Sequence, residues 1–196
     1  MTPLDIASFR PESGSHRPRT QCKLIHSHEG LYGIFKVEDR YIRCIHTTFQ
    51  SDVHEDSSVE IFLQPPKKQG YFNFEFNCGG TLFASYVTNS TRVNKNIKEF
   101  QLFSQAENLQ IKRFHSLPSR VDPEQKAPAT WLLEFFIPFA ILENYVGNLG
   151  DDEKQLWKGN AFKCGEKTSH PHWGSWVALD ELEFHAPANF GELRFR

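Results

Sequence analysis

The stretch that decides the fold is Ser58 to Asn77, "SVEIFLQPPKKQGYFNFEFN". Successive side chains of a β-strand point to opposite faces, so alternation with a period of two indicates a strand. In residues 58–64 one face holds Val59, Ile61 and Leu63, which are apolar. The opposite face holds Ser58, Glu60, Phe62 and Gln64. Although Glu60 sits inside an apolar run, we expect its carboxylate on an outer, more polar face.

The second half of this stretch, residues 71–78, repeats the same division. One face holds Phe72, Phe74, Phe76 and Cys78, and the other holds Tyr71, Asn73, Glu75 and Asn77. Residues 65–70, "PPKKQG", are typical of a turn. If the two strands pair as a hairpin, their polar faces align, and Glu60 joins a row of Asn, Glu and Tyr side chains.

Strand patterns continue along most of the chain. Further strands are predicted at residues 22–28, 31–39, 40–49, 81–88, 109–115, 130–137, 157–164, 173–179 and 191–195. The best short helix is at residues 138–146, with Pro138 at its first turn and Gly147 after its end. Residues 88–107 are polar without a clear period, and we expect a long surface excursion there. Many short strands and little helix predict an all-β fold, an antiparallel β-sandwich of the jelly-roll or immunoglobulin-like kind.

The length and charge of the chain limit its organisation and partners. The 196 residues suit a single domain at 18–196, preceded by a polar, proline-containing N-terminal extension or strap at 1–17. The net charge of −2 gives no reason to expect nucleic acid as a partner. The most apolar run, residues 131–142, is too short to span a bilayer, so no membrane association is expected. We expect a monomer.

The cysteines and the N-terminus bear on the cellular compartment. Cys22, Cys44, Cys78 and Cys164 are widely spaced, and no Cys-x-x-Cys pattern occurs. Reduced, partly buried thiols in a cytoplasmic protein are the simplest interpretation. The first 20 residues lack a basic start followed by an apolar stretch, so no signal peptide is predicted, although secretion stays open.

The polar strand face has a composition suited to a hydroxyl-rich ligand. Asn and Gln provide both donors and acceptors, and a carboxylate accepts from two hydroxyls. Vicinal hydroxyls of a sugar need these groups, and an aromatic wall would cover the apolar side of a pyranose. The alternative is an ordinary solvent-facing sheet, since antiparallel sheets commonly expose one face.

Two further interpretations belong to other functional classes. Glu60 and Glu75, with Asp56 nearby, have the residue types of a glycoside-cleaving carboxylate pair. Histidines two residues apart, at 26 and 28 and at 170 and 172, offer part of a zinc site. A zinc site needs three or four ligands, however, and neither pair has a third fixed by spacing. We therefore expect no cofactor and no catalytic residue.

Seven segments together resemble the family 9 carbohydrate-binding modules, in the order seen there. They are "LYGIFKVEDRYIR", "DSSVEIFLQP", "GYFNFEFNCGGTL", "WLLEFFIPF", "WKGNAFKCG", "HPHWGSW" and "FHAPANFGEL". The resemblance covers roughly residues 18–196. It implies a β-sandwich module that binds carbohydrate without cleaving it, and the chain looks like a stand-alone version of such a module. The wider group of sandwich domains also includes haem-binding members, so the resemblance keeps a histidine-based metal or haem site as an alternative. It also suggests structural calcium, for which the loops at 54–58 and 150–154 offer carboxylates.

The resemblance also suggests which side chains form the site. The family glutamate in the "D-x-x-V-E" strand corresponds to Glu60, and the tryptophan before the last strand to Trp176, with Trp173 as a neighbouring candidate. A second family tryptophan, six residues before that glutamate, is replaced by His54. The remaining expected polar ligands are Asn73, Asn77 and, from its place at a strand end, Arg40.

Overall fold

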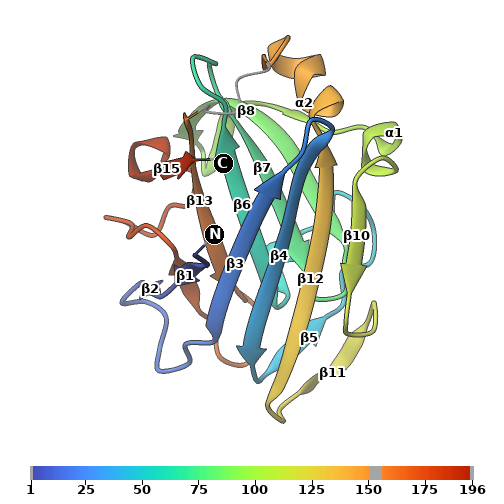
Figure 1. Ribbon diagram of the computed structural model, residues 1–196. Helices are drawn as coiled ribbons and strands as arrows, with labels where there is room; N and C mark the ends of the chain where they lie inside the picture. Colours follow the sequence, from blue (N-terminus) through green and yellow to red (C-terminus); the bar gives the residue numbers. More distant parts are fainter. Residues whose placement is uncertain (1, 151–155, 195–196) are drawn as a thin grey trace.

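The computed structural model describes residues 2–150 and 156–194. It confirms the antiparallel β-sandwich, with two sheets packed face to face (Figure 1). The first sheet has the strand order β1-β3-β4-β12-β10. Its strands are β1 (Leu4–Ile6), β3 (Arg19–His26), β4 (Gly30–Asp39), β12 (Ala129–Pro138) and β10 (Lys112–His115).

The second sheet has eight strands in the order β2-β14-β13-β6-β7-β8-β9, with β15 also paired to β13. They are β2 (Ser8–Phe9), β14 (Trp173–Ser175), β13 (Leu156–Cys164), β6 (Ser58–Gln64), β7 (Tyr71–Asn77), β8 (Leu82–Val93), β9 (Asn96–Leu102) and β15 (Gly191–Arg194). A two-stranded ribbon of β5 (Ile42–Cys44) and β11 (Val121–Gln125) lies at one end of the sandwich (Figure 1).

Four short helices connect the strands within residues 2–150 and 156–194. They are the α-helices α1 (Gln105–Asn108) and α2 (Phe139–Val146) and the 3₁₀ helices η1 (Val53–Glu55) and η2 (Pro187–Asn189). The predicted helix at 138–146 is therefore confirmed as α2, which lies at the opposite end from β5 and β11 (Figure 1). None of the helices within the described residues is long and apolar enough to cross a bilayer.

The main core lies between the two sheets, and strand alternation explains its composition. The side chains predicted to face inward belong to one buried cluster with Phe35 and Trp131 of the other sheet. They are Val59, Ile61 and Leu63 of β6, Phe72, Phe74 and Phe76 of β7, and Cys78 just after β7. Burying one such phenylalanine contributes about 1.5–3 kcal/mol. All four cysteines are buried and free.

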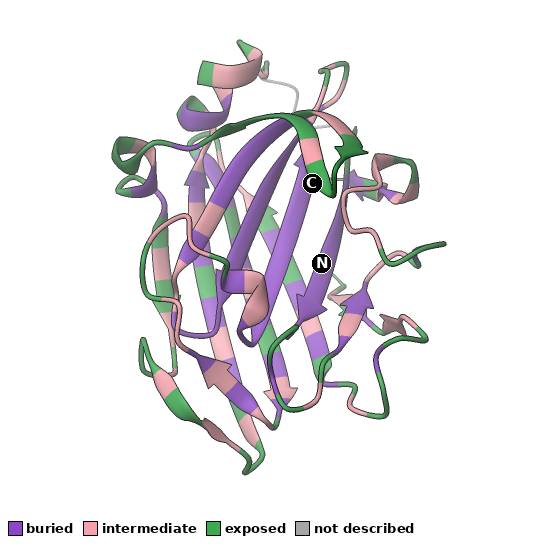
Figure 2. Cartoon of the chain, turned by 180° about the vertical axis from the view of Figure 1, so that it is seen from behind, coloured by how far each residue is buried: buried purple, intermediate pink, exposed green. Residues whose placement is uncertain are grey.

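A second, smaller apolar cluster lies on the other side of the eight-stranded sheet. It consists of Phe62, Tyr71, Val87, Phe162, Leu179 and Phe190. Its last two members come from the segment that follows β14, which packs over this sheet. As a result the central strands of the sheet are buried on both faces, as Figure 2 shows from behind.

The predicted surface excursion at 88–107 is wrong in its local structure. Strands β8 and β9 form a long hairpin, and its turn residues Asn94 and Lys95 have φ values of 51° and 71°. Two such residues are typical of a tight type I′ hairpin turn. Val93 and Phe100 of this hairpin are about half exposed. Alternation was absent from the sequence because neither face of its outer part packs on the core.

The segment predicted as an extension or strap, 1–17, contributes a strand to each sheet from its described residues, 2–17. β1 pairs with β3, and β2 pairs with β14. Ile6 between them is 1% exposed and joins the main core. The segment therefore crosses from one sheet to the other along the edge of the sandwich.

Candidate functional site

The hairpin of β6 and β7 aligns its polar side chains as the alternation predicted. Glu60 lies directly opposite Glu75, and Phe62 lies opposite Asn73. The neighbouring strand extends these rows, because Phe83 of β8 lies opposite Glu75 and Ser85 lies opposite Asn73. Residues paired across strands point to the same face. All of these side chains therefore share the outer face of the eight-stranded sheet.

This face is not the ordinary solvent-facing sheet that the alternation also allowed. Glu60, Asn73 and Glu75 are 3%, 1% and 7% exposed. We call these three residues the cavity floor, because they line a cavity of about 1150 Å³ above the sheet. Its other lining residues are Asp52, His54, Phe83, Ser85, Arg92, Lys95, Asn96, Ile97, Phe100, Glu166, Trp173, Leu182, Glu183, Phe184 and His185.

Hydrogen bonds within the cavity floor leave one acceptor without a partner. The Asn73 amide donates from Nδ2 to Glu75 Oε1 over 2.8 Å. The Cys164 thiol donates to Glu60 Oε1, with 3.2 Å between the atoms. Asn73 Oδ1, however, is buried and accepts no hydrogen bond from any residue that the structure describes. A buried acceptor left unpaired costs about 1–3 kcal/mol, so a donor from a ligand would be favourable there.

The charges at the floor shift the pKa values of two groups. Burial, reinforced by the neighbouring carboxylate of Glu75, raises the pKa of Glu60 well above its usual range. The same Glu75 raises the pKa of His54 to about 9. His54 Nδ1 lies 3.7 Å from Glu75 Oε2, and its Nε2 lies 3.8 Å from Glu166 Oε2. At neutral pH His54 is therefore a cation held between two carboxylates.

The walls of the cavity combine aromatic rings with charged side chains that are fixed by ion pairs and hydrogen bonds. The Trp173 indole donates from Nε1 to Glu166 Oε1 over 3.3 Å, which fixes the orientation of its ring. On the opposite side Arg92 of β8 makes a bidentate pair with Glu183, with distances of 2.6 and 2.8 Å. Phe184 stacks on Phe162 with 4.2 Å between ring centroids. The site thus offers an indole, three phenylalanines (Phe83, Phe100 and Phe184) and a polar floor.

Comparisons with known proteins identify the family to which the chain belongs. The model of the carbohydrate-binding family 9 matches residues 3–195. The chain belongs to carbohydrate-binding family 9. No curated protein matches the chain.

Solved structures show the same fold. A protein from Bacteroides uniformis, assigned as a carbohydrate-binding protein, is 29% identical, with a TM-score of 0.84 over 100% of this chain and 85% of its own. A family 9 module from Caldicellulosiruptor kristjanssonii in complex with glucose is 12% identical, with a TM-score of 0.56 over 100% and 84%. The same organism's family 9 module in complex with cellotriose has a TM-score of 0.59 at 12% identity, over 100% and 82%.

The structure of this family 9 domain separates the predicted site residues into two groups. Glu60, Asn73, His54 and Trp173 line the cavity. Trp176 does not line it, and its side chain packs against the main core instead. The step of three residues from Trp173 to Trp176 takes the chain past the end of β14, so the two indoles lie in different surroundings.

Asn77 and Arg40 also lie outside the cavity lining. Asn77 holds a turn, because its Nδ2 donates to His46 O and to Asp56 Oδ2, and its Oδ1 accepts from the Thr81 backbone. Arg40 follows β4, and its guanidinium lies over the Tyr41 ring at 4.7 Å. The arginine in the cavity wall is Arg92.

Several lining residues were missed by sequence reasoning. Arg92 lies in the hairpin that was predicted as an excursion, and Glu166 follows β13 in a turn. Phe184 and His185 belong to a loop without strand alternation. The resemblance offered one signal for these two, since "FHAPANFGEL" begins at Phe184. His185 Nδ1 bonds the Tyr71 hydroxyl at 2.7 Å, and burial lowers the pKa of His185 to about 4.

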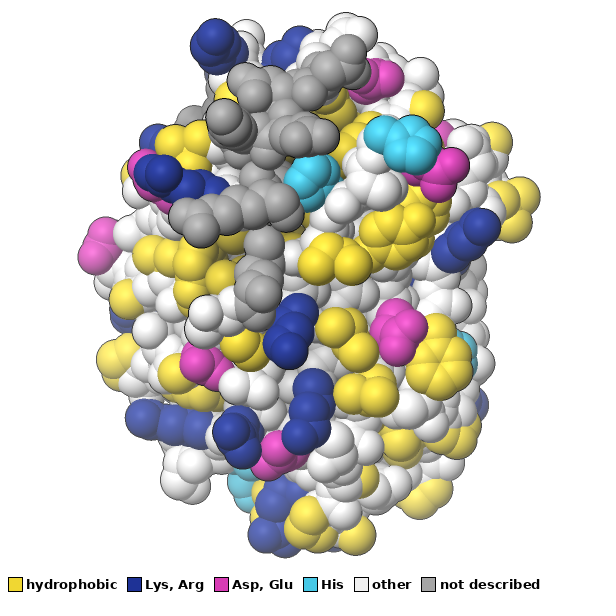
Figure 3. Space-filling view, in the orientation of Figure 1, with side chains coloured by type: hydrophobic (Ala, Val, Ile, Leu, Met, Phe, Trp, Pro, Cys, Tyr) yellow, Lys and Arg dark blue, Asp and Glu magenta, His cyan; other side chains and the backbone are white. Residues whose placement is uncertain are grey.

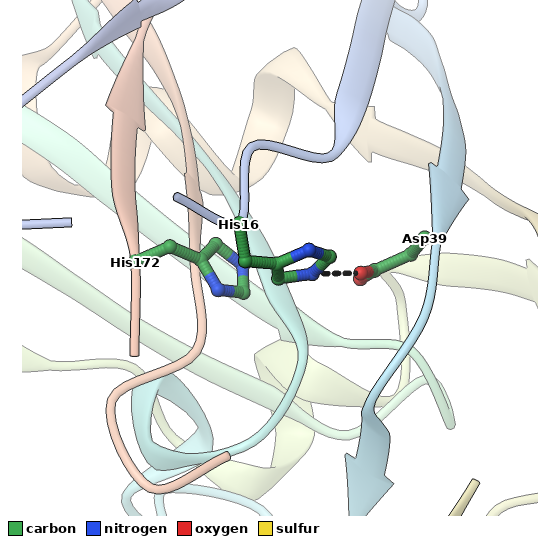
Figure 4. Close-up of side chains that lie close together, drawn as sticks. All are labelled: His16, Asp39 and His172. Atoms are coloured by element: carbon green, nitrogen blue, oxygen red, sulfur yellow. Dashed lines mark hydrogen bonds and ion pairs between the residues drawn. The ribbon is translucent and has the colours of Figure 1, made fainter. Parts of the chain in front are cut away.

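The two histidine pairs lie in different parts of the fold, and His172 joins another group. His16, Asp39 and His172 each place one ligand atom within 4.8 Å of the others (Figure 4). The ammonium of Lys163 lies among them, 2.8 Å from His172 Nε2 and 3.3 Å from Asp39 Oδ2. We call these four residues the Lys163 cluster. Because the ammonium already takes the place of a cation, the group does not fit a metal ion.

The remaining expected ligands lie elsewhere. His26 and His28 are at the turn between β3 and β4, and His28 is 91% exposed. In the acid-rich loop at 54–58, Asp56 accepts from Arg43 and from the backbone of Ile45 and His46. The Asp56 carboxylate therefore stabilises the loop itself. The other loop proposed for calcium, 150–154, lies outside the described residues from position 151 onward.

A separate hollow of about 500 Å³ lies on the outer face of the five-stranded sheet. Tyr32 and Phe136 pair there across β4 and β12, with 4.5 Å between ring centroids. Figure 3 shows apolar side chains on this face interrupted by lysines, arginines and carboxylates. The hollow is lined by fewer polar side chains than the cavity above the eight-stranded sheet. It is therefore the weaker candidate for a hydroxyl-rich ligand.

Proposed function

We propose that this family 9 domain binds a carbohydrate, without cleaving it, in the cavity above the eight-stranded sheet. The observation that carries the proposal is the cavity floor, where buried hydrogen-bonding side chains face a space large enough for a ligand. Membership of the family supports it. The ligands of the Caldicellulosiruptor modules, glucose and cellotriose, and the carbohydrate-binding assignment of the Bacteroides protein support it as well.

Each group at the site has a specific role in the proposal. Asn73 Oδ1 and the Glu60 carboxyl accept hydrogen bonds from sugar hydroxyls. Trp173 stacks on the apolar face of a pyranose, since its indole is held at the cavity wall by Glu166. His54, a cation at neutral pH, donates a hydrogen bond from the rim. In this arrangement Trp173 supplies the stacking surface, and Trp176 serves the core.

The placement of the two acids supports binding rather than cleavage. Glycoside hydrolysis needs one carboxyl group on each side of the scissile bond. Glu60 and Glu75 are direct cross-strand neighbours on one floor, so a ligand lies above both rather than between them. Glu75 is also engaged by the Asn73 amide and by His54.

The first experiment measures sugar binding by calorimetry after a glycan-array screen, with Trp173→Ala as the test variant. We expect affinity to fall about 10- to 100-fold, because covering a large apolar side chain contributes about 1.5–3 kcal/mol. The matched control is Tyr32→Ala, since Tyr32 is an aromatic side chain, 38% exposed, on the opposite sheet. Equal affinities for wild type and Trp173→Ala would overturn the proposed site.

A second experiment tests the absence of catalysis. The sugars that bind are incubated with the protein, and the release of reducing ends is measured over hours. We expect no release above a buffer control. Release that Glu60→Gln abolishes, while Tyr32→Ala keeps it, would show a glycoside-cleaving enzyme and contradict non-catalytic binding.

A further inference from the structure

The charges that line the cavity are unequal in sign. Carboxylates come from five residues, which are Asp52, Glu60, Glu75, Glu166 and Glu183. The permanent cations are Arg92 and Lys95, and Arg92 is already paired with Glu183. His54 adds one positive charge beside the floor. The buried floor therefore holds the carboxyl groups of Glu60 and Glu75 with the single cation His54 beside them.

The floor also offers more hydrogen-bond acceptors than donors. Glu60 and Glu75 contribute acceptors when ionised, and the free atom of Asn73 is its oxygen, since its nitrogen already donates to Glu75. An unpaired acceptor that is buried in the floor, independent of the carboxylates, indicates where a donor belongs. A ligand group with several donors and no acceptor fits this position best.

We infer that the sugar recognised by this site is an amino sugar, whose ammonium group binds on Glu60, Glu75 and Asn73 Oδ1. The inference rests on the proposed function, because it specifies the ligand of the same site. An ammonium carries three donors and no acceptor, which matches the two carboxylates and the orphan amide oxygen. A neutral hydroxyl supplies only one donor and cannot serve all three oxygens.

The electrostatics of Glu60 support the same ligand. Its pKa is raised because burial and the carboxylate of Glu75 disfavour its ionised form, and Glu166 adds to this effect. His54 and the Cys164 thiol oppose the shift without cancelling it. An ammonium between Glu60 and Glu75 would favour ionised Glu60, since opposite charges attract strongly where water is excluded. A sugar carboxylate at the same position would be repelled, so uronic acids are selected against.

The test compares matched sugars that differ at one substituent. Glucose and galactose are each used as the neutral sugar, the 2-amino derivative and the 2-acetamido derivative, at about pH 6, where the amine is protonated. Affinities are measured by calorimetry with the whole chain. We expect the amino derivative of the preferred series to bind at least about tenfold more tightly than its neutral and acetylated forms, because hydrogen bonds to charged groups are the stronger ones.

The variants assign this preference to the floor. In Glu60→Gln the ratio of amino-sugar to neutral-sugar affinity should fall toward one. In Glu134→Gln, an exposed carboxylate on the other sheet, the ratio should stay at the wild-type value, which excludes general attraction to an acidic surface. Circular dichroism and a urea midpoint establish that each variant is folded before its affinities are compared.

The outcomes separate this inference from the proposed function. Neutral sugars that bind as tightly as their amino derivatives, or more tightly, overturn the inference and leave carbohydrate binding intact. A preference that Glu60→Gln retains also overturns it, because the ammonium would then bind elsewhere. If neither these sugars nor any glycan on the array binds, the proposed function fails, and the inference fails with it.

Discussion

The Lys163 cluster and the cavity floor both bury a carboxyl group that has a histidine beside it, but their charges are balanced differently. The cluster connects β4 of one sheet with β13 of the other through Lys163, which is fully buried. Its ammonium contacts an acid, an imidazole and the Cys164 carbonyl. The floor has no lysine or arginine among its members. Asp39 Oδ2 of the cluster and Asn73 Oδ1 of the floor both lack a hydrogen-bond partner among the described residues, but only Asp39 Oδ2 has an ammonium beside it, at 3.3 Å. A buried polar group that contains its own cation indicates structure, and one that lacks it indicates a ligand.

The histidines of the two regions show the same contrast. Burial and the nearby Lys163 ammonium lower the pKa of His172 to about 3, so it stays neutral and accepts from that ammonium. In the floor region, Glu75 raises the pKa of His54 to about 9. One imidazole is therefore held neutral by a cation and the other is held charged by carboxylates. Experiments that remove each partner test this comparison directly.

The largest effect is expected for Lys163→Met. This change leaves the buried Asp39 without its cation, and breaking a buried ion pair from one side costs about 3–5 kcal/mol. We expect the free energy of unfolding, measured in urea, to fall by that amount. The control is Lys167→Met, since Lys167 pairs with Glu55 at 2.7 Å but is 62% exposed, and such a pair contributes less than about 1 kcal/mol.

A double variant keeps this prediction testable if Lys163→Met folds poorly. Replacing Asp39 by Asn as well removes the uncompensated charge, so Lys163→Met with Asp39→Asn should be more stable than Lys163→Met alone. A double variant that is less stable than the single one would show that the ammonium acts by packing rather than by charge.

The next largest effect is a fall in the free energy of unfolding as the pH is lowered. The folded pKa of His172 lies below its usual 6.5, so the unfolded chain binds that proton more readily. Its contribution is fully present above about pH 6.5 and is lost as the pH falls toward 3. Despite the opposing effect of burial, Lys163 and His16 hold the pKa of Asp39 below its usual range, which adds a loss of the same sign at lower pH.

Urea unfolding at several pH values measures this effect. One proton contributes at most about 1.4 kcal/mol per pH unit, so the wild type should approach that slope in the acid range where His172 titrates. His172→Gln removes the titrating imidazole and should give a shallower slope. An unchanged slope in His172→Gln would mean that other groups carry the acid dependence.

Much of the fold could be predicted because strand alternation records burial. The faces of 58–64 and 71–77 were predicted residue by residue, and helix α2 ends at Gly147, whose φ of 69° favours glycine. The hairpin of β8 and β9 could not be predicted in the same way. Its outer half packs on no core, so nothing in the sequence distinguishes its two faces, and Phe100 is 48% exposed.

Among the residues that line the cavity, those of the floor could be predicted from the sequence, and most of those in the walls could not. Glu60 and Asn73 lie on strands, where a period of two assigns each side chain to a face. Trp173 and Trp176 could not be distinguished, because the choice depends on where β14 ends. The walls come from segments that are distant in sequence, as Arg92 and Glu183 meet across 91 positions. Contacts of that kind depend on tertiary packing, which alternation does not encode.

The smallest effect is expected at His54, and its sign is opposite to that of His172. Because Glu75 raises the folded pKa of His54 from 6.5 to about 9, the stabilisation by this pair is fully present below about pH 6.5 and is lost as the pH rises through 9. The His54 side chain is 37% exposed, so solvent screens the pair and the loss should stay below about 1 kcal/mol. Wild type and His54→Gln are compared by urea unfolding at about pH 6 and 9.5, with His28→Gln as an exposed control. The wild type and His28→Gln should lose this increment on the alkaline side, and His54→Gln should not. An equal alkaline loss in all three proteins would mean that the imidazole is not held as a cation by the floor, and the contrast between the two buried clusters would then rest on Lys163 alone.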